Sequence, residues 1–283
     1  MSENGPVRSV VITGASTGIG EACALRLDRK GIRVFAGVRN GADGESLRMR
    51  SSDYLTPVII DVTDPESIAS ACETIADIVG GEGLAGVVNN AGVYFGGPLE
   101  FISLGGIRGE FEVNFFGAIA VTQTFLPLLR TGRGRIVNIS SISGLVAFPF
   151  MGPYASSKFA LEAISDCWRV ELRPWGIHVA LVEPGDIDTP IWDKGIETLK
   201  GVRDELPREA HELYGPVFGL AEKSGRRGIP ADRVAEVVEH ALTARKPKIR
   251  YLVGSDAKRV SIFRRLPARF LDWVISRKLP TYP

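Results

Sequence analysis

A tyrosine and a lysine four residues apart, Tyr154 and Lys158, are the side chains of this 283-residue chain best suited to chemistry. A segment typical of a helix, about 155–173, follows directly, and residues four apart share a helix face. A free phenol has a pKa of about 10, and a fixed cation nearby favours the phenolate. The pair could therefore donate a proton to a carbonyl oxygen or accept one from an alcohol. Alone, the same spacing also fits two residues on a helix surface.

Polar residues elsewhere in the sequence could complete such a site. Ser140 and Ser141 end a strand-like segment, and a serine hydroxyl there could hydrogen-bond a substrate oxygen beside Tyr154. Asn114 lies inside a segment typical of a long helix, about 107–130, although asparagine is a poor helix former. Its side-chain carbonyl, or a water held there, could connect Lys158 to solvent.

A glycine-rich turn, 13–20, lies between a strand-like and a helix-like segment. Gly14 permits a sharp turn, while Gly18 and Gly20 permit close approach of backbone to a ligand and of the helix to the sheet. Unpaired N–H groups at the helix N-terminus suit a pyrophosphate. Glycine at such turns can also be purely steric, but the context favours dinucleotide binding. The predicted cofactor contacts here are Gly14, Ser16, Thr17, Gly18, Ile19 and Gly20.

The type of dinucleotide depends on the residue after the second strand-like segment. Arg39 stands there in place of the acid that usually binds the ribose 2′-OH of NAD. A guanidinium can bind a 2′-phosphate, so NADP(H) is favoured over NAD(H), although Arg39 could also be a solvated surface residue. Further cofactor contacts are expected from the ends of later strands: Asp61 and Val62 near adenine, Asn90, Ala91 and Gly92 near ribose, and Pro184, Gly185, Ile187 and Thr189 near nicotinamide.

Apolar strand-like runs alternate with helix-like segments along the whole chain. The runs are 7–13, 32–38, 57–61, 84–89, 134–140, 177–182 and 248–253. Strands that are apolar throughout indicate a parallel sheet covered on both faces. We therefore expect a single doubly wound, Rossmann-type α/β domain with a mainly parallel seven-stranded sheet, and ligands at the carboxyl ends of its strands. Asp61 could also cap the helix after it, for which Thr63 or Asp64 is the expected cap, with a capping box between Thr63 and Glu66.

Composition limits the partners and the compartment. Thirty-four Lys+Arg against 33 Asp+Glu give a net charge of +1, which provides no argument for nucleic acid. Three cysteines and three histidines are scattered, so we expect no metal site and unpaired thiols in a reducing compartment. The polar start of the chain and the lack of an apolar run of roughly 20 residues favour a cytoplasmic protein without a membrane span.

In order, these motifs resemble the short-chain dehydrogenase/reductase family over about 7–189: TGASTGIG, NNAG, Asn114, the serine strand, YASSK and PGDIDT. The resemblance implies an NAD(P)-dependent alcohol dehydrogenase or carbonyl reductase with a catalytic tetrad of Asn114, Ser141, Tyr154 and Lys158. Ser141 is preferred because the family's serine usually stands about 13 residues before the tyrosine. Tyr154 would be the acid/base, Lys158 would bind ribose and lower the tyrosine's proton affinity, and Asn114 would support a proton relay.

The resemblance also implies a homodimer or homotetramer formed through the two long helices. One departure concerns the cofactor. NADP-preferring members often carry a second basic residue in the glycine-rich turn, where this chain has Ser16 and Thr17. A lapsed dinucleotide-binding regulatory or scaffold protein is the alternative from another class, but the intact tetrad argues against it.

The C-terminal third is similar to the branch with 17β-hydroxysteroid and retinol dehydrogenases, at 182–185 and 250–254. After a cofactor-binding and catalytic core (1–189), residues 190–228 would form a lid, and 229–283 a helix, the last strand and a tail. An apolar lining suits a steroid-, retinoid- or lipid-like alcohol or ketone, and an acyl-carrier ketone or a sugar is the alternative substrate. The lining residues expected are Ile191, Trp192, Leu199, Leu213, Tyr214, Val217, Phe218 and Leu220, with Tyr94, Phe95, Phe148, Phe150 and Met151. They could instead be core or oligomer contacts.

Residues 262–279 mix arginines with large apolar side chains. The favoured interpretation is one final helix that covers the sheet or the mouth of the pocket. A weak peripheral contact with a membrane surface is the alternative.

Overall fold

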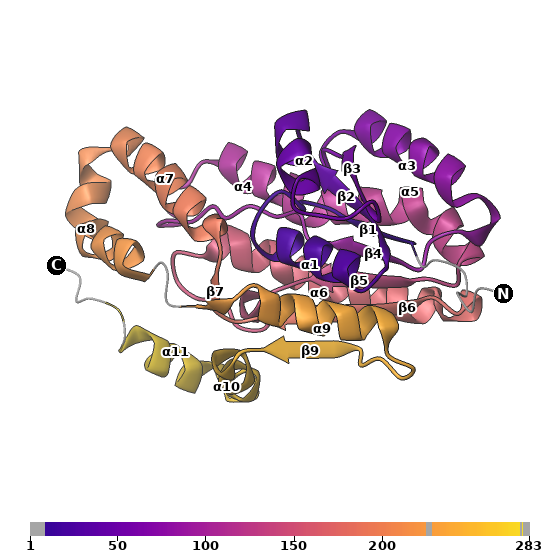
Figure 1. Ribbon diagram of the computed structural model, residues 1–283. Helices are drawn as coiled ribbons and strands as arrows, with labels where there is room; N and C mark the ends of the chain where they lie inside the picture. Colours follow the sequence, from indigo (N-terminus) through magenta and orange to yellow (C-terminus); the bar gives the residue numbers. More distant parts are fainter. Residues whose placement is uncertain (1–8, 225–227, 278, 280–283) are drawn as a thin grey trace.

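A seven-stranded sheet forms the centre of the molecule (Figure 1). The computed structural model describes residues 9–224, 228–277 and 279. The strand order is β3-β2-β1-β4-β5-β6-β9, and every neighbouring pair is parallel, which confirms the predicted sheet. The strands are β1 (Ser9–Ile12), β2 (Arg33–Val38), β3 (Leu55–Ile59), β4 (Gly86–Asn89), β5 (Arg135–Ile139), β6 (His178–Pro184) and β9 (Arg250–Val253).

Helices cover both faces of this sheet. On one face, α1 (Gly18–Arg29) and α9 (Asp232–Thr243) bury residues such as Leu27 and Val238 in a common core. On the other, α3 (Pro65–Val79), α5 (Gly117–Thr131) and α6 (Gly152–Glu171) bury Ile75, Phe125 and Trp168. Burial on both sides explains why the strands carry apolar side chains throughout. The winding reverses between β1 and β4, where doubly wound sheets bind ligands.

Three local features differ from the expectations. A helix that was not predicted, α2 (Gly41–Arg48), begins at Asn40, whose side chain accepts a hydrogen bond from the Asp43 N–H at 2.9 Å. Asp64 caps α3, because the Thr63 hydroxyl donates to Asp61 at 2.7 Å and no capping box with Glu66 forms. A short parallel ladder also joins β7 (Ile187–Asp188) to β8 (Ile229–Pro230).

The long helix expected at 107–130 extends over Leu104–Thr131 and is interrupted by a π-helical turn. It comprises α4 (Leu104–Phe111), the π turn Glu112–Phe116 and α5. Within the described parts of the chain, this is the one helix long and apolar enough to cross a membrane by length and composition. Its buried Phe125 and Leu129 belong to the core beneath the sheet, as in a core helix of a folded domain.

Two helices follow β7: α7 (Pro190–Glu205) and α8 (Arg208–Ser224). They project from the sheet near the carboxyl ends of its strands (Figure 1). The side chains of four residues expected to line the pocket, Leu199, Val217, Phe218 and Leu220, lie outside those that the structure describes, as does Val7 at the start of the chain.

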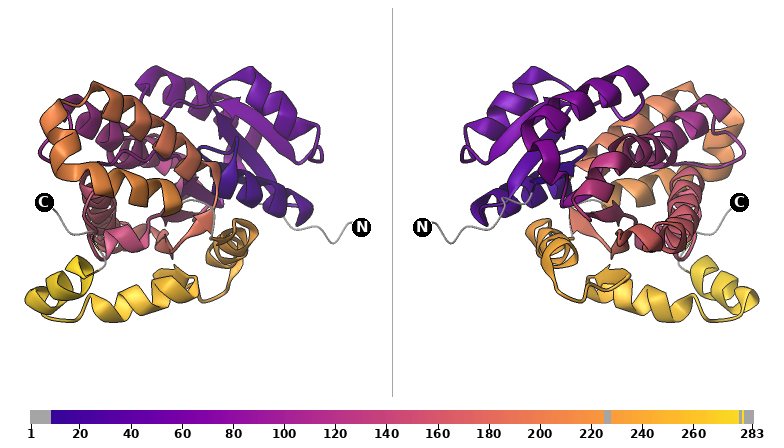
Figure 2. Two further views of the ribbon diagram at one scale, coloured as in Figure 1. Left: turned by 90° about the vertical axis from the view of Figure 1, so that its left-hand side faces the viewer. Right: turned by 90° about the vertical axis from the view of Figure 1, so that its right-hand side faces the viewer.

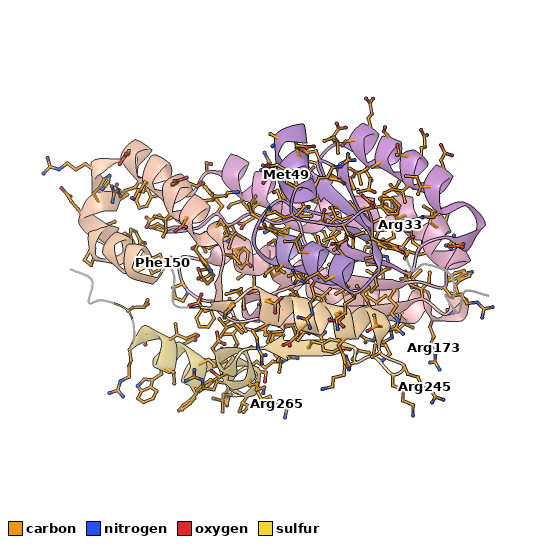
Figure 3. All side chains as sticks on the ribbon, viewed as in Figure 1. Arg33, Met49, Phe150, Arg173, Arg245 and Arg265 are labelled. Carbon is orange, nitrogen blue, oxygen red and sulfur yellow. The ribbon has the colours of Figure 1, made fainter. Side chains whose placement is uncertain are left out.

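The C-terminal segment is two short helices, so the prediction of one covering helix is wrong. These are α10 (Ser255–Phe263) and α11 (Ala268–Ser276). Pro267 lies between them, and a proline disfavours helical backbone in the residue that precedes it. Only Ala257 of α10 is buried, and α11 has no buried residue. Both helices lie along the outside of the body (Figure 2), and Arg265 between them marks this outer side in Figure 3.

Candidate active site

A cavity of about 310 Å³ opens at the carboxyl ends of β1, β4, β5 and β6. It collects residues from turns that are far apart in the sequence. All the expected cofactor contacts except Gly20 line it: Gly14, Ser16, Thr17, Gly18, Ile19, Arg39, Asp61, Val62, Asn90, Ala91, Gly92, Tyr154, Lys158, Pro184, Gly185, Ile187 and Thr189. Ser141 lines the same cavity, whereas Asn114 lies behind its wall.

Gly20 acts in packing instead. A Cβ at this position would overlap the carbonyl oxygen of Gly14 and the side-chain nitrogen of Asn90. Gly14 and Gly18 both have a φ of 63°, which residues with a side chain rarely adopt. The glycines thus bring the N-terminus of α1 close to the turn, and the cradle that results fits a pyrophosphate.

The glycine-rich turn is braced by residues that the sequence did not single out for this role. The Thr13 hydroxyl accepts hydrogen bonds from the N–H groups of Asn90 and Ala91, at 3.0 and 3.1 Å. The Asn90 amide donates to the carbonyls of Thr13 and Gly14, at 2.9 and 3.0 Å. The turns after β1 and β4 are therefore fixed relative to each other.

Arg39 and Asp61 lie at the adenosine end of the cavity. Asp61 accepts hydrogen bonds from the N–H and the hydroxyl of Thr63, which lower the pKa of Asp61, and the charge of Arg39 lowers it further. Asp61 therefore builds the turn before α3 while it faces the cavity. Arg39 itself is exposed at the rim.

Tyr154 and Lys158 lie in the first turns of α6, and both are buried. The Lys158 ammonium is 5.7 Å from the centre of the Tyr154 ring and donates to the carbonyl of Ile139 at 2.9 Å. Burial is the main influence on each group. It lowers the pKa of Lys158 to about 8, against the opposing charges of Glu110 and Glu162.

Burial also raises the pKa of Tyr154 to about 12, and a hydrogen bond with the Ser141 side chain counters only part of this rise. Burial is therefore the main influence on this phenol, and the expected effect of the Lys158 charge stays a prediction. The physical reason is that desolvation of a buried phenolate outweighs the hydrogen bond that stabilises it.

The two serines differ in surroundings. Ser141 approaches the Tyr154 phenol, and its hydroxyl accepts a hydrogen bond from the Ser143 N–H at 3.1 Å. The Ser140 side chain packs toward Glu162 and Gly144. Of the two, Ser141 is therefore placed beside the tyrosine.

Asn114 lies in the π-helical turn and is buried. Its side chain accepts from the Val93 N–H at 2.8 Å and donates to the Val93 carbonyl at 2.9 Å and to the Ser157 hydroxyl at 3.1 Å. The side-chain carbonyl, expected to reach toward Lys158, is thus bonded to the segment after β4. Asn114 joins that segment to α6.

The sequence model of the family described as short chain dehydrogenase matches residues 8–200 of this chain. The chain belongs to the short-chain dehydrogenase family. Relatives include 17-beta-hydroxysteroid dehydrogenase type 6 of Bos taurus (40% identical, covering 96% of this chain and 88% of the relative) and retinol dehydrogenase 5 of Mus musculus (38%, 96% and 88%). NADPH-dependent 3-dehydrocapnine reductase of Ornithobacterium rhinotracheale is 35% identical, covering 96% of this chain and 98% of the relative.

Crystal structures of other short-chain dehydrogenases share this fold. One from Streptomyces avermitilis has a TM-score of 0.77 and 27% identity, covering 98% of this chain and 95% of that one. Two others are 25% identical: one from Burkholderia cenocepacia in complex with NADP (TM-score 0.75, covering 95% and 97%) and one from Burkholderia phymatum in complex with NAD (0.76, 98% and 97%). This short-chain dehydrogenase is therefore a nicotinamide-dependent oxidoreductase that interconverts alcohols and carbonyl compounds.

Sequence reasoning missed a buried carboxyl group beside α6 of this dehydrogenase. Glu110 is 1% exposed, and one of its oxygens accepts from the Phe95 N–H at 3.0 Å. Its other oxygen has no hydrogen-bond partner among the described residues. Burial raises the pKa of Glu110 to about 8. The available signal was its position four residues before Asn114, on the same face of the long helix.

A second missed feature of the dehydrogenase lies behind Lys158. Arg250 of β9 bonds Glu162 of α6, Glu183 of β6 at 2.6 Å and Asp166 at 2.9 Å. Burial raises the pKa of Glu162 to about 7, although Arg250 opposes this rise. The cluster joins α6 to the last two strands of the sheet, β6 and β9.

The apolar residues expected around the substrate separate into two groups. Tyr94, Ile191 and Trp192 line the cavity of the dehydrogenase. Phe95 packs on Gly106, Phe150 contacts Tyr214, and Leu213 is exposed. Among the described side chains, three of the residues expected to line the substrate pocket therefore line the cavity.

Proposed function

We propose that this dehydrogenase interconverts an apolar, ring-bearing secondary or primary alcohol and its ketone or aldehyde, with Tyr154 as the acid/base. The observation that carries the proposal is the buried Tyr154–Lys158 pair, beside Ser141, in one cavity with the glycine-rich turn. Relatives named for hydroxysteroids and retinol support the apolar substrate class. So does the lining by Tyr94, Ile187 and Trp192.

In the reductive direction, Ser141 and Tyr154 hold the substrate carbonyl oxygen by hydrogen bonds. The dinucleotide, when bound, supplies the hydride to the carbonyl carbon. Tyr154 donates its phenolic proton to the oxygen as negative charge develops there. The Lys158 ammonium, held by the carbonyl of Ile139, stabilises the phenolate that remains and binds the nicotinamide ribose. Asn114 keeps the wall between the segment after β4 and α6 in place and supports return of a proton from solvent.

Replacing Tyr154 with phenylalanine tests this mechanism. We expect Tyr154→Phe to lower kcat by about 10²–10⁴-fold, because the proton donor is lost while the ring and its packing remain. Cofactor affinity, measured by fluorescence titration, should change little. The matched control is Tyr54→Phe, at a half-exposed tyrosine outside the cavity. Unchanged turnover in Tyr154→Phe would remove Tyr154 from the reaction.

The preferred cofactor in this proposal is NADP(H). Its support is Arg39 at the rim of the cavity where the second strand ends. A guanidinium there is suited to the 2′-phosphate. The relative from Ornithobacterium rhinotracheale is named NADPH-dependent, while related structures hold NADP or NAD.

The assembly proposed is a homodimer or homotetramer that forms through the long helices. Large apolar side chains are exposed along this region, namely Phe116, Phe159, Val170 and Trp175. Burial of such side chains between copies is a common use of exposed apolar surface. Residues 190–228 act in this proposal as a lid over the core formed by 1–189.

We place the enzyme in the cytoplasm, in peripheral contact with a membrane surface through α10 and α11. Free cysteines support a reducing compartment. Phe270 and Trp273 are about half exposed on α11, and Ile262 and Phe263 are exposed on α10. Basic residues flank them: Lys258, Arg259, Arg264, Arg265, Arg269 and Arg277. Apolar and aromatic residues beside cations are typical of helices that lie on anionic bilayers.

A further inference from the structure

Tyr94 lies between the catalytic helix and the segment formed by α7 and α8. Its ring contacts the Tyr154 ring edge-on, with 5.5 Å between centres, and the Trp192 ring of α7 at 5.4 Å. All three side chains line the cavity. Tyr94 therefore connects the proton-donating residue to the first turn of α7.

Two glycines make room for this ring. A Cβ at Gly195, three residues after Trp192 on α7, would overlap Cδ1 of Tyr94. A Cβ at Gly96 would press against the Tyr94 hydroxyl at 2.5 Å. The helix α7 thus approaches Tyr94 as closely as backbone allows, which only glycine at 195 permits.

The backbone on each side of Tyr94 is held by buried side chains. Asn114 exchanges two hydrogen bonds with Val93, and Glu110 accepts from the Phe95 N–H. These bonds come from the long helix, a rigid element packed in the core. Tyr94 is consequently fixed to the body of the enzyme.

The second helix of the segment meets the same side of the molecule. Tyr214 of α8 contacts the rings of Phe101 and Phe150 at 5.9 and 6.1 Å, and its hydroxyl donates to Glu100 at 2.9 Å. Phe150, labelled in Figure 3, lies beside α8. Both helices of the segment therefore rest on the residues that follow β4 and precede α6.

We propose that Tyr94 is the docking point of the lid and the specificity-determining wall of the substrate site. The lid closes when Trp192 and Gly195 pack on the Tyr94 ring. A flat apolar ring system of the substrate takes the place of Trp192 against the Tyr94 ring, while the contact of Gly195 with Tyr94 keeps α7 docked. This placement leads the substrate carbonyl to Tyr154. The specificity role of Tyr94 rests on the proposed function, because it assumes that the ring system of the substrate packs on one face of Tyr94.

The docking half is tested by limited trypsin cleavage, which needs no substrate. Lys194, Lys200, Arg203 and Arg208 offer cleavage sites within the lid. We expect Tyr94→Ala and Gly195→Ala to be cleaved there about tenfold faster than the wild-type chain, because either change weakens the contact that holds α7 closed. Tyr94→Phe, the matched control, should match the wild type.

Circular dichroism and the melting temperature establish that each variant is folded. Gly195→Ala changes the contact between α7 and Tyr94 from the lid side and leaves Tyr94 itself in place. It therefore tests the docking role even if Tyr94→Ala fails to fold. Equal cleavage rates for the wild type and Gly195→Ala would overturn the docking role.

The specificity half is tested with two ketones of different size, a flat polycyclic ketone and cyclohexanone. For Tyr94→Ala, we expect kcat/KM for the polycyclic ketone to fall by about tenfold more than for cyclohexanone, mainly through KM. Tyr94→Phe should restore the wild-type ratio. An equal loss on both ketones, carried by kcat, would reduce Tyr94 to a support for Tyr154 and overturn its role in specificity.

Failure of the proposed function gives a different pattern. In that case the wild-type chain would reduce neither ketone, or Tyr154→Phe would keep full turnover. The cleavage rates would still decide whether α7 docks on Tyr94.

Discussion

At the scale of single residues, burial controls the groups around the site. Tyr154, Lys158 and Glu110 are each shifted toward the neutral form, with pKa values of about 12, 8 and 8. The reason is the same for all three groups: the free energy lost by removing a charge from water exceeds the stabilisation that the few nearby dipoles provide. A charge on Glu110 raises the pKa of Tyr154 and also that of Lys158. The protonation state of Glu110 therefore affects the pKa values of both Tyr154 and Lys158.

Glu110 should make stability depend on pH in a defined direction. Its pKa rises from 4.5 in the unfolded chain to about 8 in the folded one, so the folded protein keeps a proton that the unfolded chain loses. Stability should therefore fall as pH rises through this window, relative to Glu110→Gln, by at most about 1.4 kcal/mol per pH unit. Glutamine can still accept from Phe95. Urea unfolding of both proteins at pH 5 and pH 8 measures the gap, and an equal gap at both values would contradict the assignment.

Arg39 is the residue on which cofactor preference depends. Arg39→Ala should raise KM for NADPH by about tenfold, because a charge-assisted contact to the 2′-phosphate is lost, while KM for NADH changes little. Initial rates with both cofactors give the ratio. Arg29→Ala, at an exposed arginine outside the cavity, is the control. A parallel change with both cofactors would show that Arg39 does not select the phosphate.

The parts of the site whose residues lie close together in the sequence could be predicted. Tyr154 and Lys158 share a helix face, and the glycines of the turn at 13–20 are neighbours in sequence, so both patterns were visible. The structure gathers them in one cavity, while their catalytic roles stay predictions. Tyr94 was expected only as part of the pocket lining, and Glu110 was not expected at all, because their roles depend on contacts with Trp192 and Phe95 that local spacing does not show.

At the scale of elements, the Arg250 cluster is the clearest case in which long-range contacts position the catalytic helix. Arg250→Met should destabilise the protein by about 3–5 kcal/mol at pH 8, because Glu162 and Glu183 are left buried without a cation. The loss should be smaller at pH 6, since the pKa of Glu162, already about 7, rises further without Arg250 and lets the group take up a proton.

Urea unfolding measures this effect, and Arg169→Met is its control. Arg169 pairs with Asp166 at a partly exposed position, so its loss should cost less than about 1 kcal/mol. Similar losses for Arg250→Met and Arg169→Met would show that the buried carboxyl groups do not depend on Arg250.

The sheet was predictable because its strands are buried on both faces and read as continuous apolar runs. Other elements depend on weaker or conflicting signals. Gly41 and Gly44 weaken the helix signal of α2 in the sequence, because glycine is a poor helix former. The Asn40 cap and the buried Leu47 nonetheless stabilise this helix. Pro267 separates α10 from α11, whereas the apolar pattern predicted one final helix over 262–279 and gave no sign of α10 before it.

At the scale of the whole molecule, α10 and α11 lie mostly exposed, with Ala257 as the one buried residue among the two helices. Their exposed aromatic and basic residues predict binding to vesicles that contain phosphatidylserine. The double variant Phe270→Ser, Trp273→Ser should bind such vesicles about tenfold more weakly in a sedimentation assay, because apolar contact area is lost. Met49→Ser, at an exposed apolar residue outside the proposed interface between copies, is the control. Equal binding of both variants would exclude α11 as the contact.

The strand order has a consequence for how the chain is made. Strands β1 to β6 come from one continuous stretch ending at Pro184, but β9, which pairs with β6, begins only at Arg250. At about 5–20 residues per second, a ribosome needs several seconds to synthesise the chain between them. During that interval the edge of β6 is without its final neighbour, and Glu162 and Glu183 are without Arg250. We therefore expect the sheet to close last at this edge, which makes it the point most open to association between nascent chains.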